Sequence, residues 1–198
     1  LFSIADYAWN MDAYKSDASW RRAVRYLMPG HAAALQVFAS HNSDLGGNEH
    51  DFRREESEQI RPALERLLDA YCREGKREVA AASAVTEECE RMIASADLLL
   101  ASDENPALIK EISPWLIQFK LLGEYGREVL CMLAAQCDGK KTELEKAASH
   151  AKALQVLMKK IDATYNQNGF QPGVKTGSCH LKPAFDRLYQ EVVQRTGK

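Results

Sequence analysis

The stretch from His41 to Ser57, HNSDLGGNEHDFRREES, gathers the residues of this sequence whose types could do chemistry. Imidazole and carboxylate groups together are ligands that zinc or manganese accepts, so one hypothesis for the stretch is a metal site. Arg53 and Arg54 stand between the acidic residues and would form ion pairs with them. The alternative is a structural loop in which Asp44 and Asn48 bond the backbone, and we prefer it. The six residues that a metal could use are His41, Asp44, His50, Asp51, Glu55 and Glu56.

Outside this stretch, the sequence lacks the motifs of the common catalytic sites. It has no pair of adjacent aspartates, no G-x-S-x-G, no H-E-x-x-H, no phosphate-binding loop and no G-x-G-x-x-G. The Glu-x-x-His repeats that hold two metal ions in helical bundles are absent too. The sequence alone therefore assigns no catalytic, cofactor-binding or metal-binding residue, and no cofactor is expected.

The roles of several aromatic and histidine side chains have to be weighed between a binding surface and a structural contact. Trp9, Tyr14, Trp20 and Tyr26 could form a surface on which sugar rings stack. We prefer core or inter-domain contacts for them, since large aromatic side chains dominate the energetics of both. The histidines outside the polar stretch stand alone in the sequence and are expected at the surface or at helix caps. They are His31, His150 and His180.

The charge balance argues against a general nucleic-acid binder, because the formal net charge is only −2. Residues 1–138 hold 15 Lys and Arg against 23 Asp and Glu, a net −8, while residues 139–198 hold 11 against 5, a net +6. Two solvated faces of opposite sign in one bundle explain this asymmetry. No apolar run approaches the roughly 18 to 20 residues of a membrane span, so no membrane partner is expected.

The five cysteines do not suggest a disulfide framework or a zinc site, because their number is odd and no C-x-x-C pair occurs. Cys89 and Cys137 fall on apolar helical stripes, where cysteine behaves as a small buried hydrophobe. Both are therefore expected in the core.

The 198 residues suffice for one domain, or for a domain with an attached fragment of another. Apolar spacing and breakers predict short helices over about 18–28 and 31–40, separated by Pro29-Gly30. A longer helix is predicted over about 54–73, with Pro62 as a candidate for its true first turn. A closing helix is predicted over about 181–195, and no segment has the alternation of a strand.

Three long helices give the clearest structural signal. They are predicted over about 76–101, from Asn105-Pro106 to Cys137 with a restart or kink at Ser113-Pro114, and over about 140–165. Apolar residues recur in them at heptad spacing, which favours near-antiparallel packing, and the short Asp138-Gly139 turn supports it. In the first, one column is Val79, Thr86, Ile93 and Leu100, a second is Ala82, Cys89 and Ala96, and Val85, Met92 and Leu99 widen the stripe.

These patterns predict an all-α, multi-helical bundle whose charges lie on the outer faces. Gly126 occupies a core position of the middle helix, which predicts a close contact between helices. The chain begins with Leu1 and has no signal-peptide pattern, so it is interpreted as a piece of a longer protein.

The residues also resemble a known family. The run ADYAWNMDAY, then SW and a short helix, then VFASHNSDLG and RREES, is similar to the segment just beyond the catalytic barrel of bacterial glycoside hydrolase family 84. These enzymes are β-N-acetylglucosaminidases called O-GlcNAcases or hyaluronoglucosaminidases. The NQNGFQPGVKTG loop and the final helix resemble the end of the same post-catalytic helical domain, whereas residues 76–160 match in helical character more than in motif.

The resemblance implies a (β/α)8 barrel upstream, with two adjacent aspartates that carry out substrate-assisted hydrolysis of N-acetylglucosaminides. This chain has no such pair, so no catalytic residue is carried over. On this interpretation residues 1–10 are the tail of the barrel's last helix, and residues 11–198 are the post-catalytic domain. The parent protein is then expected to be secreted or periplasmic in a bacterium.

Two functions follow as hypotheses for the chain itself. One is a non-catalytic accessory domain whose partner is the catalytic barrel of the same polypeptide. The other is a stand-alone helical module for protein interaction, which the regular heptads motivate. Under the first hypothesis, exposure of the barrel-facing surface around Trp9 would promote self-association of the isolated fragment. An active enzyme within this chain is not expected.

Overall fold

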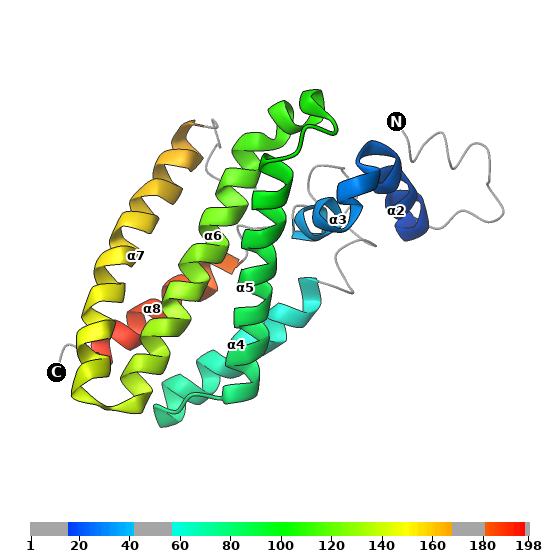
Figure 1. Cartoon of the computed structure of the whole chain (residues 1–198). Helices are drawn as coiled ribbons and strands as arrows, with labels where there is room; N and C mark the ends of the chain where they lie inside the picture. The colour runs from blue at the N-terminus through cyan, green and yellow to red at the C-terminus, as the bar shows by residue number, and fades with distance from the viewer. Residues whose placement is uncertain (1–15, 42–56, 168–180, 197–198) are drawn as a thin grey trace.

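The computed structural model describes residues 16–41, 57–167 and 181–196, and these residues form helices without any strand. The predicted all-α architecture is confirmed for this part of the chain. Its helices, labelled in Figure 1, are α2 (Ser16–Leu27), α3 (Ala32–His41), α4 (Ser57–Glu74), α5 (Val79–Leu100), α6 (Pro106–Asp138), α7 (Lys141–Gln167) and α8 (Leu181–Thr196). A short 3-10 turn, η1 (Pro29–His31), lies between α2 and α3.

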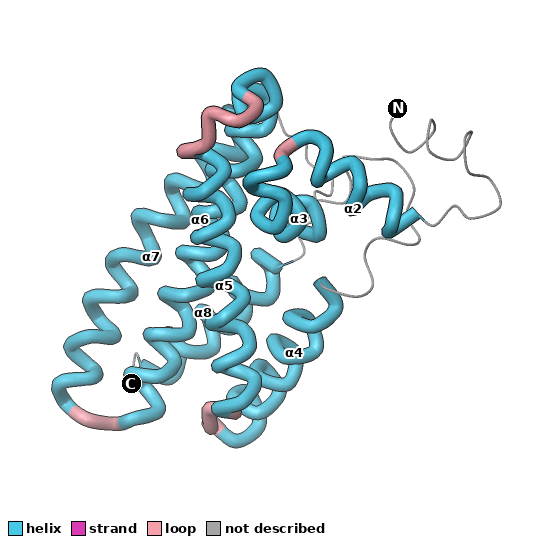
Figure 2. Tube along the Cα trace, turned by 45° about the vertical axis from the view of Figure 1, so that its right-hand side comes forward, coloured by secondary structure: helices cyan, strands magenta, loops and turns pink. Residues whose placement is uncertain are grey.

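The three long helices α5, α6 and α7 lie side by side, with α6 in the middle, and successive helices run in opposite directions (Figures 1 and 2). Helix α4 packs on α5, α8 packs on α6, and α4 and α8 contact each other across the lower half of the bundle as Figure 1 draws it. Helix α3 packs on α5 near the other end and carries α2 with it. The fold is thus one bundle with a short helical unit attached to its side.

Helix α6 begins where the sequence predicts and continues through a proline. The Asn105 side chain accepts the N–H of Leu108 at 3.2 Å, which caps the first turn. Pro114 cannot donate to the carbonyl of Lys110, four residues earlier, so that carbonyl loses its usual partner. The Ser113 hydroxyl donates to this carbonyl at 3.1 Å. This substitute bond explains why Ser113-Pro114 does not restart the helix.

The stripe of α5 that faces the core differs from the first predicted column. Val79, at the start of that column, is 68% exposed. The fully buried positions are Ala81 and Val85 together with the second column and the residues that widen it, namely Ala82, Cys89, Ala96, Met92 and Leu99. An α-helix turns by about 100° per residue, so a seven-residue column placed at the edge of the contact stays at the edge.

Gly126 makes the close contact that its core position predicts, and Gly123 makes a second one. A Cβ atom at Gly126 would lie 2.5 Å from Cζ of Phe185 in α8 and 2.7 Å from Sγ of Cys89 in α5. A Cβ atom at Gly123 would lie 2.9 Å from the backbone oxygen of Cys89. Two glycines one turn apart therefore let α5 approach α6 directly.

Three local predictions are wrong. Helix α4 starts at Ser57, so Pro62 lies inside it and not in its first turn. Cys137 is exposed, because it falls in the last turn of α6 beyond the part that neighbouring helices cover. The heptad spacing of the third long helix also predicts an inward column that begins at Leu144, but Leu144 is 47% exposed, since α7 packs mainly on α6 and buries the stripe of Ala147, Leu154 and Ile161.

One continuous core joins residues from every described helix, from Val24 and Met28 in α2 and the turn after it to Val192 in α8. None of the described helices combines the length and the apolarity that crossing a membrane requires. The helical bundle thus rests on the burial of its apolar faces against one another.

Candidate functional site

Of the six residues considered as metal ligands, the structure describes His41, whereas Asp44, His50, Asp51, Glu55 and Glu56 lie outside the described residues. Trp9, Tyr14, His180 and the side chain of Trp20 lie outside them as well, so the aromatic surface stays a prediction. Tyr26 is 77% exposed at the end of α2. Within the polar stretch, the structure therefore describes His41 at its start and Ser57 at its end.

His41 ends α3 and forms a buried pair with α5. Its Nε2 lies 2.6 Å from Oε1 of Glu88, and the two side chains are only 2% and 8% exposed. The imidazole ring also packs on the ring of Phe119 in α6, and the guanidinium of Arg91 pairs with the other oxygen of Glu88. The prediction that the bundle helices keep their charges outside is wrong at Glu88, because this carboxylate points inward to bind α3.

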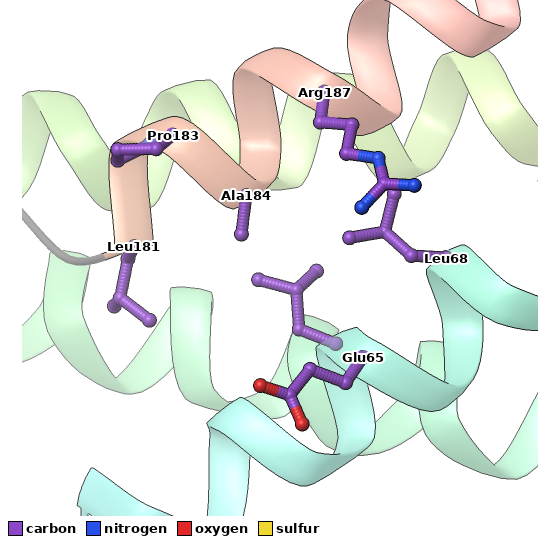
Figure 3. Close-up of a pocket in the computed structure, with 7 residues that line it drawn as sticks. Glu65, Leu68, Leu181, Pro183, Ala184 and Arg187 are labelled. Atoms are coloured by element: carbon purple, nitrogen blue, oxygen red, sulfur yellow. The ribbon is translucent and has the colours of Figure 1, made fainter.

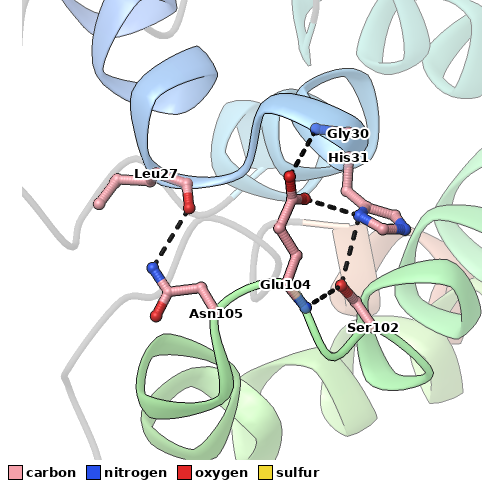
Figure 4. Close-up of polar contacts among 6 residues, drawn as sticks. All are labelled: Leu27, Gly30, His31, Ser102, Glu104 and Asn105. Atoms are coloured by element: carbon pink, nitrogen blue, oxygen red, sulfur yellow. Dashed lines mark hydrogen bonds and ion pairs between the residues drawn. The ribbon is translucent and has the colours of Figure 1, made fainter.

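A second histidine–carboxylate pair joins η1 to the loop between α5 and α6 (Figure 4). Oε1 of Glu104 accepts the backbone N–H of Gly30 at 2.7 Å, and Oε2 lies 2.8 Å from Nδ1 of His31. The Ser102 hydroxyl lies 3.3 Å from the same ring nitrogen. The side chains of His31 and Glu104 are 25% and 23% exposed, so the pair lies at the edge of the contact.

Asn105 links the same two segments by its other side-chain atom. Its Nδ2 donates to the carbonyl of Leu27 at 3.2 Å, which gives a partner to a backbone group at the C-terminus of α2. Its Oδ1 caps α6. The Asn105 side chain thus bonds both the C-terminus of α2 and the N-terminus of α6. The segments Leu27–His31 and Ser102–Asn105 form a single polar joint (Figure 4).

His150 in α7 lies 2.6 Å from Oε2 of Glu128 in α6, so it too has a carboxylate partner. Its side chain is 31% exposed. His31, His41 and His150 are therefore not isolated in the fold, and each pairs with a carboxylate from another segment. Histidine serves here as a neutral or charged donor between helices.

The hollow shown in Figure 3 lies between α4 and α8 and measures about 280 Å³. Its floor is apolar, with the buried Leu64 and Leu68 from α4 and Leu181 from α8. Glu65 and Arg187 stand at its rim. A retaining glycosidase with two carboxyl groups holds them roughly 5 to 5.5 Å apart across the bond to be cleaved. Among the described residues that line the hollow, Glu65 is the one acidic side chain, so these residues do not supply that pair.

The far end of α4 is closed by α8. Nη2 of Arg195 donates to the carbonyl of Cys72 at 2.9 Å, and its guanidinium lies 4.7 Å from the centre of the Tyr71 ring. Burial raises the pKa of the Tyr71 hydroxyl, which has no hydrogen-bond partner in the described part of the chain. Earlier in α8, Asp186 accepts a hydrogen bond from the Tyr125 hydroxyl at 2.7 Å. These contacts fasten α8 to α4 and α6.

The four thiols in the described residues show no sign of an activated nucleophile. Cys72, Cys89, Cys131 and Cys137 are free, and burial is the main cause that raises the pKa of each one. An activated cysteine has a lowered pKa instead. Among the described residues no three His, Cys, Asp or Glu side chains are placed to share a metal ion. In this part of the chain, some ionisable groups pair within one helix, as Arg73 and Asp69 do, and others join two helices, as His41 and Glu88 do.

The same residues match a known family of domains. The model of the bacterial GH84 post-catalytic domain matches residues 56–189, more than half of the chain. The chain belongs to this family. The resemblance drawn from the sequence is thereby confirmed, although the N-terminal motifs ADYAWNMDAY and VFASHNSDLG lie before the matched region.

Two solved structures share the fold of this GH84 domain. CpGH84B is matched with a TM-score of 0.70 at 19% identity, over 93% of this chain and 30% of that one. CpGH84D is matched with a TM-score of 0.74 at 24% identity, over 98% of this chain and 32% of that one. The chain thus spans about a third of the length of these structures. At these identities the likeness establishes the fold.

Sequence reasoning missed the two pairs that fix α3, His41 with Glu88 and His31 with Glu104. Each pair joins residues at least 47 positions apart. The signal available in the sequence for Glu88 was an acidic residue beside Cys89 on the apolar stripe of a long helix. Such a charge needs a partner when the helix packs.

Proposed function

We propose that this GH84 post-catalytic domain is a non-catalytic accessory domain that packs on the catalytic barrel of its own polypeptide and positions it. The proposed activity of the parent protein is hydrolysis of terminal β-linked N-acetylglucosamine, as in O-GlcNAcases and hyaluronoglucosaminidases. The observation that carries the proposal is the family match over residues 56–189. The stand-alone interaction module is the weaker hypothesis, because the matched family is defined by its place after a catalytic domain.

The polar contacts of the described helices support a scaffold more than an active site. Three acidic side chains, Glu88, Glu104 and Glu128, each bind a histidine from another helix or turn. A general acid and a nucleophile would instead converge on an open pocket with separated pKa values. Rigid joints between helices are what a positioning domain needs.

The proposed division places residues 1–10 in the last helix of the barrel and residues 11–198 in the post-catalytic domain. The described helices begin at Ser16, and α2 and α3 come first in the chain. This helical unit would then be the part of the domain that follows the barrel most directly in sequence.

The test compares the 198-residue chain with the longer parent protein on a chromogenic N-acetylglucosaminide. The parent is expected to release the chromophore, whereas the chain alone is expected to release none above a buffer blank. A bundle variant with Glu128→Gln serves as control for the folded chain, since the change touches an acid that binds His150. Turnover by the 198-residue chain would overturn the proposal.

A further inference from the structure

The helical unit Ser16–His41, hereafter the N-terminal unit, is held to the bundle by polar contacts near the two ends of α3 and by buried apolar residues of the common core, among them Met28 and Leu35. Helix α2 packs mainly on α3 and η1, and α3 packs on α5. The end of α3 is held by the buried His41–Glu88 pair and by Phe38, whose ring lies 5.5 Å from that of Phe119. The beginning of α3 is held at the polar joint around Glu104 (Figure 4).

The two attachments differ in kind. At the His41 end, the side chains of the pair are at most 8% exposed and lie against an aromatic ring. At the Glu104 end, the paired side chains are about a quarter exposed, so solvent reaches them. Buried contacts break only with the core, whereas an exposed polar contact can open by itself.

A single carboxylate carries much of the exposed attachment. One oxygen of Glu104 accepts the Gly30 N–H at 2.7 Å, and the other meets the His31 ring at 2.8 Å. Both donors belong to the N-terminal unit and the acceptor belongs to the α5–α6 loop. Asn105 adds one neutral hydrogen bond, to the carbonyl of Leu27 at 3.2 Å. Hydrogen bonds to a charged group are about twice as strong as neutral ones.

We propose that the Glu104 carboxylate is an acid-sensitive latch, which holds the N-terminal unit in one position on the α5–α6 hairpin and releases that end of it when protonated. In the context of the proposed function, on which this role rests, the latch would fix the angle between the bundle and the domain that precedes it. Release leaves the His41 end and the buried apolar residues Met28 and Leu35 in place, so the joint loosens and the unit does not dissociate.

The sign of the pH effect follows from the contacts. The Gly30 N–H and then the His31 ring hold the pKa of Glu104 below its usual range, with a smaller contribution from the His31 backbone N–H, and among the described residues His31 is the charged group that contributes to that lowering. From its own loop, Glu104 has Ser102 as a further polar neighbour, whose hydroxyl accepts the Glu104 N–H at 3.2 Å. A lowered pKa means that the closed form prefers the ionised acid. The latch is therefore closed above the ordinary carboxyl range and opens as the pH falls through the lowered pKa.

The test uses the 198-residue chain with Glu104→Gln, which keeps the shape of the side chain and removes its charge. Asp103→Asn is the matched control, because Asp103 is the exposed neighbour in the same loop and undergoes the same change of charge. Hydrogen exchange is followed for the Gly30 amide, for α3, and for the central turns of α5 and α6.

In Glu104→Gln, the Gly30 amide and the first turn of α3 are expected to exchange on the order of tenfold faster, the change expected from weakening one hydrogen bond to a charged group. Exchange in the central turns of α5 and α6 is expected to stay as in the parent chain, and Asp103→Asn is expected to change neither. Equal exchange in the two variants at Gly30, or an equal loss of protection throughout the bundle, would overturn the latch.

A pH titration of the Gly30 amide resonance gives the second readout. In the unmodified chain the resonance is expected to shift with a midpoint below the usual range of a glutamate, and in Glu104→Gln this shift is expected to vanish. A shift that persists in the variant would show that another group controls the joint, contrary to the proposal. These measurements need no substrate, so the latch and the accessory function can fail separately.

Discussion

Replacement of Gly126 by alanine should destabilise the bundle, even though alanine is the better helix former. Gly126 lies where α6 meets both α5 and α8. An added Cβ would stand 2.5 Å from Cζ of Phe185 and 2.7 Å from Sγ of Cys89, and both of those side chains are fully buried. Carbon atoms in contact are normally about 3.5 to 4.0 Å apart, so each neighbour must retreat by about 1 Å.

The expected loss of stability in Gly126→Ala is the balance of two opposing effects. Inserting atoms into a well-packed core costs about 1 to 3 kcal/mol, and two neighbours on different helices place this site toward the upper end. Replacing glycine by alanine inside a helix stabilises the helix by about 1 kcal/mol. The expected net loss is about 2 kcal/mol, which lowers the melting temperature of a chain of this size by about 4 to 8 °C.

Urea unfolding followed by circular dichroism measures this loss, and a double-mutant cycle with Cys89→Ala locates it. Removing Sγ takes away one of the two contacts, so the double variant should lose less than the sum of the single variants by about 1 kcal/mol. A Gly126→Ala chain at least as stable as the parent, or strictly additive losses in the cycle, would refute the close approach of the three helices.

Two further predictions concern the histidine pairs and the thiols. His41→Ala should lower the free energy of unfolding by about 3 kcal/mol, because it leaves the carboxylate of Glu88 buried with one partner fewer. His150→Ala, at the more exposed pair, should lower it by about 1 kcal/mol or less. Equal losses in urea unfolding would contradict the role of burial. Burial raises the pKa of the Cys89 thiol to about 12, so Cys89 should resist alkylation at pH 8 until the chain unfolds, while the exposed Cys131 is labelled in the native state. Mass mapping of the labelled peptides decides this, and equal labelling rates at the two sites would be inconsistent with the structure.

The apolar spacing of the sequence was sufficient to predict the long helices and the fold class. The start of α6 at Asn105-Pro106 and its end at Gly139 follow from local chemistry, since an asparagine side chain caps a first turn and a glycine adopts the left-handed conformation after the last. The close contact at Gly126 was also visible, because a residue without a side chain at a core position needs a neighbour to fill the space. Such features depend on neighbours within a few residues.

The polar stretch that begins at His41 illustrates the limit of local reasoning. The residue types suggested a metal site or a structural loop, and the sequence could not show what His41 meets. In the structure its Nε2 faces Glu88, 47 residues away, which favours a joint over a ligand at this residue. The remaining residues of the stretch lie outside the described ones, so the loop interpretation stays a prediction for them.

The sequence by itself determined that this chain is an all-α domain, where most of its helices lie, and which family it resembles. Tertiary structure decided which face of each helix is buried, as the exposure of Val79 and Leu144 and the burial of Glu88 demonstrate. Periodicity defines a stripe but not the helix that covers it, and a charge is buried only where a distant residue supplies its partner. The carboxylates of Glu88 and Glu104 join segments of the fold because each pairs with a histidine that is 47 or 73 residues away in the sequence, respectively.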